Sequence, residues 1–163
     1  MSNSKTLTPK RILFLLSVTH SVVTAGALLF ILFIFITTND LVLGFPTGNN
    51  VFVYLVPVIS MIAYFGSNYY FQKKLAYMIN SNSLREKLVL YQQTSIVRYA
   101  ILDAATFFSA IAFMFSSNVF YLVISLLLLL YLIKLRPTKG KLAEDLALNK
   151  EETLRFQNEN RPL

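Results

Sequence analysis

The chain has 163 residues, of which 55% are hydrophobic and only 14% are charged. A soluble domain of this length needs polar side chains over most of its exterior, so this composition excludes an ordinary soluble fold. The absence of cysteine excludes structural disulfides, thiolate metal sites and thiol redox chemistry. A net charge of +7 would suggest nucleic acid for a soluble protein. In a membrane protein the positions of Lys and Arg matter more than their sum, so no nucleic-acid partner is predicted.

The first apolar run covers residues 12–36, contains no charge and follows Lys10 and Arg11. A membrane-spanning helix needs roughly 20 such residues. A signal peptide is the alternative, but its apolar core would be about 7–15 residues long and would end at a small-residue cleavage site. Here Ala25, Gly26 and Ala27 lie inside the run, with more apolar sequence beyond them. The run therefore predicts an uncleaved span.

Turn-forming residues over 37–50 predict a loop, which is followed by a second span over residues 51–70. Pro57 falls in the first two turns of this span, where neighbouring helices can satisfy the carbonyl that it frees. Tyr69 and Tyr70, followed by Lys73 and Lys74, are typical of an aromatic belt that passes into a basic interface.

Residues 96–135 would measure about 60 Å as one helix, twice the thickness of a bilayer core. The sequence from Ser116 to Asn118 predicts a break, and hence spans over 96–115 and 119–135. Ser83 and Glu86 have the spacing of a capping box, which predicts one long helix from about Leu84 into the third span. Small residues along the third span predict that it is central. The leucine-rich fourth span is predicted to face lipid, with a dimer face as the alternative.

Residues 136–163 are predicted to form a tail with a short amphipathic helix, whose apolar stripe includes Leu142 and Leu146. The sequence from Asn149 to Glu152 predicts a cap for a further turn or two of helix. The last ten residues are expected to fray.

Lys and Arg flank the spans on one side only, and the two opposite loops contain neither residue. By the positive-inside rule, both termini are predicted to lie in the cytoplasm. The expected fold is an all-α integral membrane four-helix bundle of two hairpins over residues 1–135. The residues predicted to contact anionic lipid headgroups are Lys10, Arg11, Lys73, Lys74, Lys134 and Arg136.

Asp103 is the one acidic residue within a predicted span. A carboxylate there costs about 2.5–3.5 kcal/mol, so it marks a candidate functional site. His20 and Tyr64 fall at a similar depth, roughly 9–13 Å from the cytoplasmic edge. The sharper hypothesis is a proton-binding cluster of His20, Asp103 and Tyr64, with Arg98 and Tyr99 beside it on the third helix. The alternative, which is favoured, is interhelical hydrogen bonding worth roughly 0.6–2 kcal/mol per pair, with Arg98 reaching the interface and screening Asp103.

Enzyme and cofactor readings are disfavoured by the residues themselves. A haem held by two histidines needs a second His, and a zinc protease needs two His and a Glu at fixed spacing. A serine hydrolase needs a nucleophile elbow, which the chain lacks. No enzyme, metal or cofactor is predicted.

Residues 96–150 carry a pattern of four parts: the stretch from Ile101 to Phe113, the pair Ser117 and Asn118, the stretch from Leu135 to Lys139, and the stretch from Glu144 to Asn149. This pattern resembles small four-helix membrane proteins of the Bacteroidota, in which Glu-Gly stands where this chain has Asp103 and Ala104. The resemblance implies a bacterial cytoplasmic (inner) membrane protein and names no reaction.

The expected role is that of a non-enzymatic accessory or scaffold component. It would present a basic cytoplasmic face, formed by residues 72–94 and the tail after Arg136, to a membrane-complex partner or a second copy. The alternative is a small oligomeric transporter or proton-responsive protein that uses Asp103.

Overall fold

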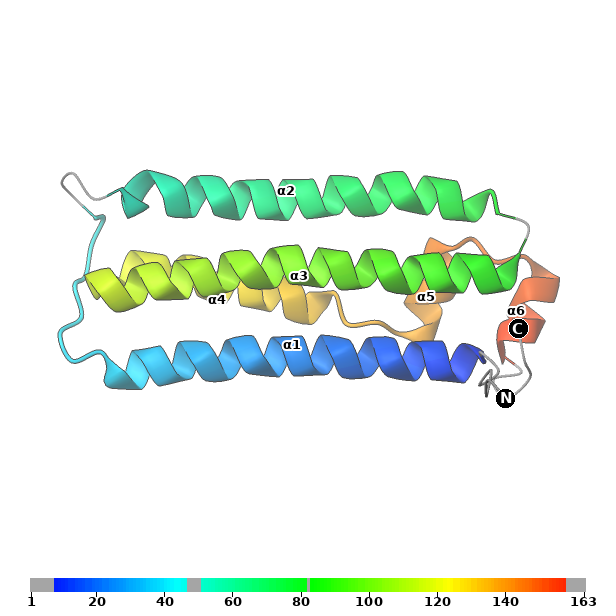
Figure 1. Cartoon of the computed structure of the whole chain (residues 1–163), viewed down its shortest axis with the longest axis horizontal. Coiled ribbons are helices and arrows are strands. Elements are labelled where there is room, and N and C mark those ends of the chain that lie inside the picture. The colour runs from blue at the N-terminus through cyan, green and yellow to red at the C-terminus, as the bar shows by residue number, and fades with distance from the viewer. Residues whose placement is uncertain (1–7, 47–50, 82, 158–163) are drawn as a thin grey trace, which may run out of the picture.

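The computed structural model describes residues 8–46, 51–81 and 83–157, and the elements within these ranges are all helices. In chain order they are α1 (Pro9–Thr37), α2 (Phe52–Ile79), α3 (Leu84–Ser116), α4 (Val119–Lys134), α5 (Lys139–Asp145) and α6 (Lys150–Gln157). The predicted all-α class is confirmed (Figure 1).

Among the described helices, α1, α2 and α3 are each long and apolar enough to cross a membrane. The helix α4 has 16 residues, about 24 Å, and qualifies as a fourth span only together with α5, from which it is bent by 84°. Large apolar side chains cover the outside of the long helices, including Leu29, Ile62 and Leu127 at 60–66% exposed. An apolar exterior of this extent is expected for a helical membrane protein.

The helix α3 forms the axis of the bundle, as the sequence predicts. It packs against α1, α2 and α4, while α1 and α2 lie on opposite sides of it (Figure 1). The side chains of Ala105, Ala110 and Ala112 are buried, and their small size lets neighbouring backbones approach closely. The leucine run of α4 is divided, since Leu128 and Leu129 are buried while Leu126, Leu127 and Leu130 are exposed. The fourth helix therefore faces outward with one side only.

The break between α3 and α4 occurs where Ser116 to Asn118 predict it. Ser117 adopts a left-handed conformation (φ 52°), and the Asn118 side chain accepts a hydrogen bond from the amide of Phe120, which caps α4. The preceding loop is tied to this turn, because Val42 N donates to Ser117 O (2.9 Å) and Val119 N donates to Val42 O (3.0 Å). Both loops thus meet at the end of the bundle opposite to Pro9.

The capping box predicted at the start of α3 is wrong in its bonding. Ser83 occupies the N-cap position, but its hydroxyl makes no capping hydrogen bond. Instead the hydroxyl of Ser81 donates to Glu86 (2.7 Å) and accepts from the amide of Ser83 (3.4 Å). The turn places Ser81 between the two expected partners, so Glu86 reaches the N-cap amide through it.

The tail folds back against the start of α3 rather than remaining separate. Leu142 and Leu146 are fully buried, Phe156 is 5% exposed, and all three share a core cluster with Leu84 and Leu88. We refer to α5, α6 and residues 84–94 of α3 as the platform. The fraying predicted from residue 154 is wrong for residues 154–157, because the burial of Phe156 holds α6 in place; the remaining six lie outside the described residues.

The cap predicted from Asn149 to Glu152 is confirmed. Glu152 N donates to the Asn149 side chain (2.8 Å), and Asn149 N donates to the Glu152 carboxylate (3.0 Å). This reciprocal pair fixes the first turn of α6.

Candidate functional site

His20 lies where α1, α3 and α4 meet, and it is 4% exposed. Its Nε2 is 2.9 Å from the carbonyl oxygen of Leu132, and its ring meets that of Tyr99 edge-on at 5.0 Å. Because a carbonyl can only accept, this hydrogen bond requires the hydrogen to be on Nε2.

Tyr99 and His20 both donate hydrogen bonds to carbonyls at the C-terminal end of α4. The last carbonyls of a helix lack partners within it. The Leu132 carbonyl accepts from His20 and from the amide of Leu135 (3.0 Å), and the Tyr99 hydroxyl donates to the Leu135 carbonyl (3.3 Å). Two of the residues predicted for the proton cluster thus cap a neighbouring helix.

Asp103 lies one turn beyond Tyr99 on α3. Its Oδ1 is buried without a hydrogen-bond partner, and so is Oγ1 of Thr24, which lies one turn beyond His20 on α1. No hydrogen bond within the described part of the chain joins Asp103 to His20 or to Tyr64. The structure therefore leaves the carboxyl group beside the cap formed by His20 and Tyr99 but not bonded to it.

Tyr64 is separate from this region. It lies on α2, is 39% exposed, and packs its ring against those of Tyr131 on α4 (4.6 Å) and Phe65 (5.1 Å). The aromatic contact joins α2 to α4, whereas His20 joins α1 to α4. The three residues proposed as one cluster thus occupy two sites on different faces of α4.

Arg98 is buried (8% exposed) and bonds away from Asp103. Its Nη2 donates to Asn68 Oδ1 and to the Tyr131 hydroxyl (2.8 Å), and Tyr131 in turn donates to Asn68 Oδ1 (2.7 Å). The guanidinium also lies over the ring of Phe71, 4.6 Å from its centroid. These contacts bind α2, α3 and α4 together, and we call Asn68, Arg98 and Tyr131 the arginine cluster.

Sequence reasoning did not identify Asn68 and Tyr131 as parts of a site. Asn68 is the only amide side chain in the second predicted span, which is a signal that could have found it. Tyr131 offers no such signal, because a tyrosine near a helix end is also typical of an interface belt.

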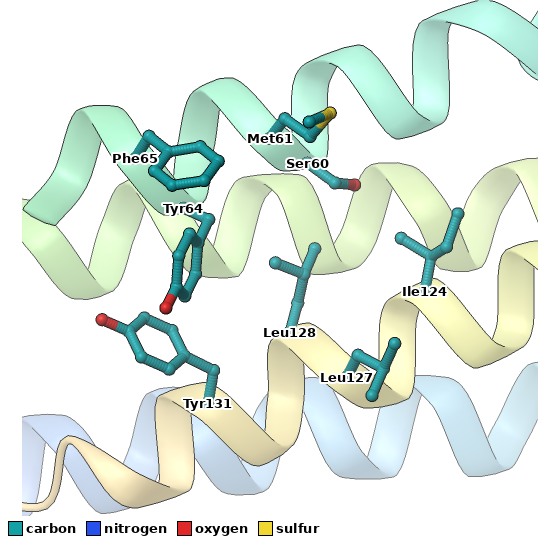
Figure 2. Close-up of a pocket in the computed structure, with 8 residues that line it drawn as sticks. All are labelled: Ser60, Met61, Tyr64, Phe65, Ile124, Leu127, Leu128 and Tyr131. Atoms are coloured by element: carbon teal, nitrogen blue, oxygen red, sulfur yellow. The ribbon is translucent and has the colours of Figure 1, made fainter.

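A groove of about 250 Å³ runs between α2 and α4, next to the arginine cluster. Figure 2 shows the paired rings of Tyr64 and Tyr131 at one end and Ile124 toward the other, with Ser60 pointing in from α2. The Ser60 hydroxyl is 3.4 Å from that of Ser109 on α3. The lining is Ser60, Met61, Tyr64, Phe65, Ile124, Leu127, Leu128 and Tyr131, and it is almost entirely apolar.

The predicted headgroup-contacting residues have room to reach outward. Lys10, Lys73, Lys74, Lys134 and Arg136 are exposed, and Arg11 is half-buried. Lys73 and Lys74 flank a shallow depression on α2 together with Tyr70 and Tyr77. Cations interleaved with tyrosines suit a membrane interface.

Two polar contacts hold the platform together. The buried Lys87 pairs with Glu152 at 2.8 Å, and the Tyr91 hydroxyl donates to Asp145 at 2.8 Å. Burial acts to raise the pKa of Glu152, but the Lys87 hydrogen bond, the Asn149 amide and the Lys87 charge together lower it. Burial, followed by the hydrogen bond to Asp145, raises the pKa of Tyr91 well above its usual 10.

The described residues contain no group of three or more His, Asp or Glu side chains that could hold a metal ion. Comparison with protein-family models, with curated proteins and with solved structures finds no match.

Proposed function

We propose that the chain is a non-enzymatic accessory or scaffold protein of the bacterial cytoplasmic membrane, with both termini and the platform in the cytoplasm. The observation that supports this role is the platform itself. A tail with no binding role would not need an ordered hydrophobic core. Here two helices are held by buried Leu142, Leu146 and Phe156 and by the Lys87–Glu152 pair. A rigid surface of this kind suits recognition of a partner, because little ordering entropy is lost on binding.

The orientation follows from the distribution of charge. The loop of residues 38–46 and the turn at 116–118 carry no Lys or Arg, whereas the opposite end carries all the residues proposed to contact anionic headgroups. The platform presents exposed Arg85, Lys150 and Arg155 together with the apolar Leu154, which is 61% exposed. This mixture fits a protein partner or a second copy better than a small solute.

The bonding of His20 and Tyr99 is consistent with an accessory role. Both side chains donate hydrogen bonds to carbonyls at the C-terminal end of α4, so both contribute to the packing of the helices.

A second candidate is a small oligomeric transporter or proton-responsive protein that uses Asp103. The observation in its favour is the buried Oδ1 without a partner, which is the kind of group that marks ion and proton paths in membrane proteins.

The experiment that tests the accessory role is site-specific photocrosslinking in the membranes of the source cell. The crosslinking residue replaces Leu154 on the platform or, as a lipid-facing control, Val22 on α1 (65% exposed). We expect a discrete protein adduct from position 154, none from position 22, and loss of the adduct when Leu142→Asp undocks the tail.

A parallel measurement addresses the second candidate. The purified protein is reconstituted into vesicles with a pH gradient, and proton flux is compared between the wild type and Asp103→Asn. The accessory role predicts equal flux in the two preparations. A flux that Asp103→Asn abolishes while the fold survives, together with no adduct from position 154, would overturn the proposal.

A further inference from the structure

We propose that the groove between α2 and α4 binds one acyl chain of an anionic phospholipid, whose phosphate is held by Arg98 and Lys134. This binding site is distinct from the platform and does not depend on the accessory role. The occupant follows from three features: an apolar channel, an unsatisfied cation at one end, and the level of that cation along the bundle.

The channel has the shape and chemistry of an acyl-chain site. Its α4 side runs over eight residues from Ile124 to Tyr131, about 10 Å of helix. The paired tyrosine rings line one end of the groove, and the lining beyond them is apolar apart from Ser60 (Figure 2). The Ser60 hydroxyl already has a neighbour in Ser109, so it does not call for a polar ligand.

The cation next to the tyrosine end of the groove lacks a counter-charge. No carboxylate pairs with Arg98 among the described residues, and its Nε is buried without a hydrogen-bond partner. Only Nη2 donates to described side chains, and one of these is Tyr131, which lines the groove. A guanidinium offers five donors in a planar fork that matches phosphate, and described side chains use only Nη2, so a phosphate would take up donors that remain.

The level of Arg98 matches that of lipid headgroups. From Ser116, at the loop end of α3, to Arg98 is 18 residues, or about 27 Å. This is close to the roughly 30 Å thickness of the hydrocarbon core. A lipid whose chain lies in the groove would therefore carry its phosphate near Arg98.

A second cation lies on the same side of α4. Lys134 follows Tyr131 by three residues, which places it one turn further toward the termini on the groove face. It is exposed and can extend its ammonium group to a phosphate. Two cations and an apolar channel distinguish an anionic phospholipid from a neutral apolar ligand.

The test uses tryptophan quenching by brominated phospholipids, and the chain has no tryptophan of its own. Leu127→Trp reports on the groove, and Val22→Trp on α1 is a control of similar exposure (60% and 65%). Each protein is reconstituted in mixtures of brominated phosphatidylglycerol or brominated phosphatidylcholine with their unbrominated counterparts. We expect preferential quenching by the anionic lipid at position 127, and equal quenching by both lipids at position 22.

Charge variants in the Leu127→Trp background separate the site from general surface attraction. Arg98→Gln and Lys134→Gln are each expected to lower the anionic preference about fivefold, while Lys150→Gln, at an exposed position of α6, leaves it unchanged. If Arg98→Gln fails to fold, Lys134→Gln alone decides. Equal preference at positions 127 and 22, or a preference that Lys134→Gln leaves intact, would overturn the proposal.

Discussion

The ring of His20 connects three helices. It lies on α1, packs edge-on against Tyr99 of α3, and donates to the Leu132 carbonyl of α4. Because α4 is short, it ends within the bundle, where water does not reach its last carbonyls. The hydrogen bond from His20 gives one of these carbonyls a partner. The lone histidine of the chain is accordingly a structural cap in this fold.

Replacing His20 by Ala is expected to destabilise the bundle by about 1–2 kcal/mol, because one interhelical hydrogen bond and an aromatic contact are lost. Unfolding in mixed micelles, followed by far-ultraviolet circular dichroism, measures the loss. Ser21→Ala is the matched control, because the exposed Ser21 adjoins His20 on α1 and is expected to change stability little. Equal stability of the two variants would contradict the capping role.

Ser117 bears a backbone conformation that suits glycine. Its φ of 52° lies in the left-handed region, where a side chain costs roughly 1 kcal/mol. Ser117→Gly is therefore expected to raise stability by about that amount, and Ser117→Val to lower it. The same unfolding assay checks both variants, and a Gly variant less stable than the wild type would contradict this reading.

At this scale the sequence predicted less of the site than of the fold. Asp103, His20 and Arg98 were identified because charge at membrane depth is costly. Their partners depend on how the helices rotate about their axes, which depth alone does not determine. Arg98 therefore meets Asn68 and Tyr131 rather than Asp103.

The platform is the element whose formation depends most on side-chain chemistry. Its helices have 7 and 8 residues, too few to be stable alone in water. They persist because Leu142, Leu146 and Phe156 are buried against α3. Stripe and cap residues predicted helix in the tail, but docking could not be predicted, since it depends on contacts between the tail and α3, which are far apart in the sequence.

Truncating one of these anchors tests the docking. Leu142→Ala removes a fully buried side chain and is expected to cost about 2–5 kcal/mol of platform stability. Limited trypsin digestion should then cleave after Lys150 and Arg155 much faster than in the wild type. Leu154→Ala, at an exposed position of α6, is the control and should leave the rate unchanged.

The Lys87–Glu152 pair makes docking sensitive to acid. The folded-state pKa of Glu152 is lowered, so its contribution is present above the usual value of about 4.3 and is lost as the pH falls through the lowered value. In a Phe156→Trp background, tryptophan emission should shift to the red as the pH falls below about 4.3. With Glu152→Gln added, the emission should no longer follow pH in this window; a persistent shift would assign the transition to another group.

Tyr91 makes docking sensitive to alkaline pH. Its pKa is raised in the folded state, so docking is stabilised while the phenol is neutral and weakens as the pH rises above about 10. With Tyr91→Phe, the same tryptophan emission is expected to lose its alkaline transition. An unchanged transition would show that another group, rather than this phenol, responds to alkali.

The whole molecule is organised around α3. The other long helices pack against this axis, the two loops are joined at one end by the Val42 hydrogen bonds, and the platform encloses the other. The sequence predicted the order of the long helices and the break before α4, because hydropathy and breaks are local properties. It also predicted a central α3, because small residues are concentrated there.

The orientation of the protein in the membrane depends on whether α4 crosses the bilayer. The 16 residues of α4 are short for a span, so a bundle that crosses the membrane only three times is the competing arrangement. That arrangement would place residues 136–157 on the same, outer side as the Leu43 loop, away from residues 84–94 of α3, against which the tail packs in this structure.

Single cysteines test this directly, because the chain has none of its own. Leu43→Cys (80% exposed) and Leu154→Cys (61% exposed) are treated, in spheroplasts of a bacterial expression host, with a thiol reagent that cannot cross the membrane. We expect labelling of position 43 in intact spheroplasts and of position 154 only after permeabilisation. Labelling of position 154 from outside would contradict the proposed orientation.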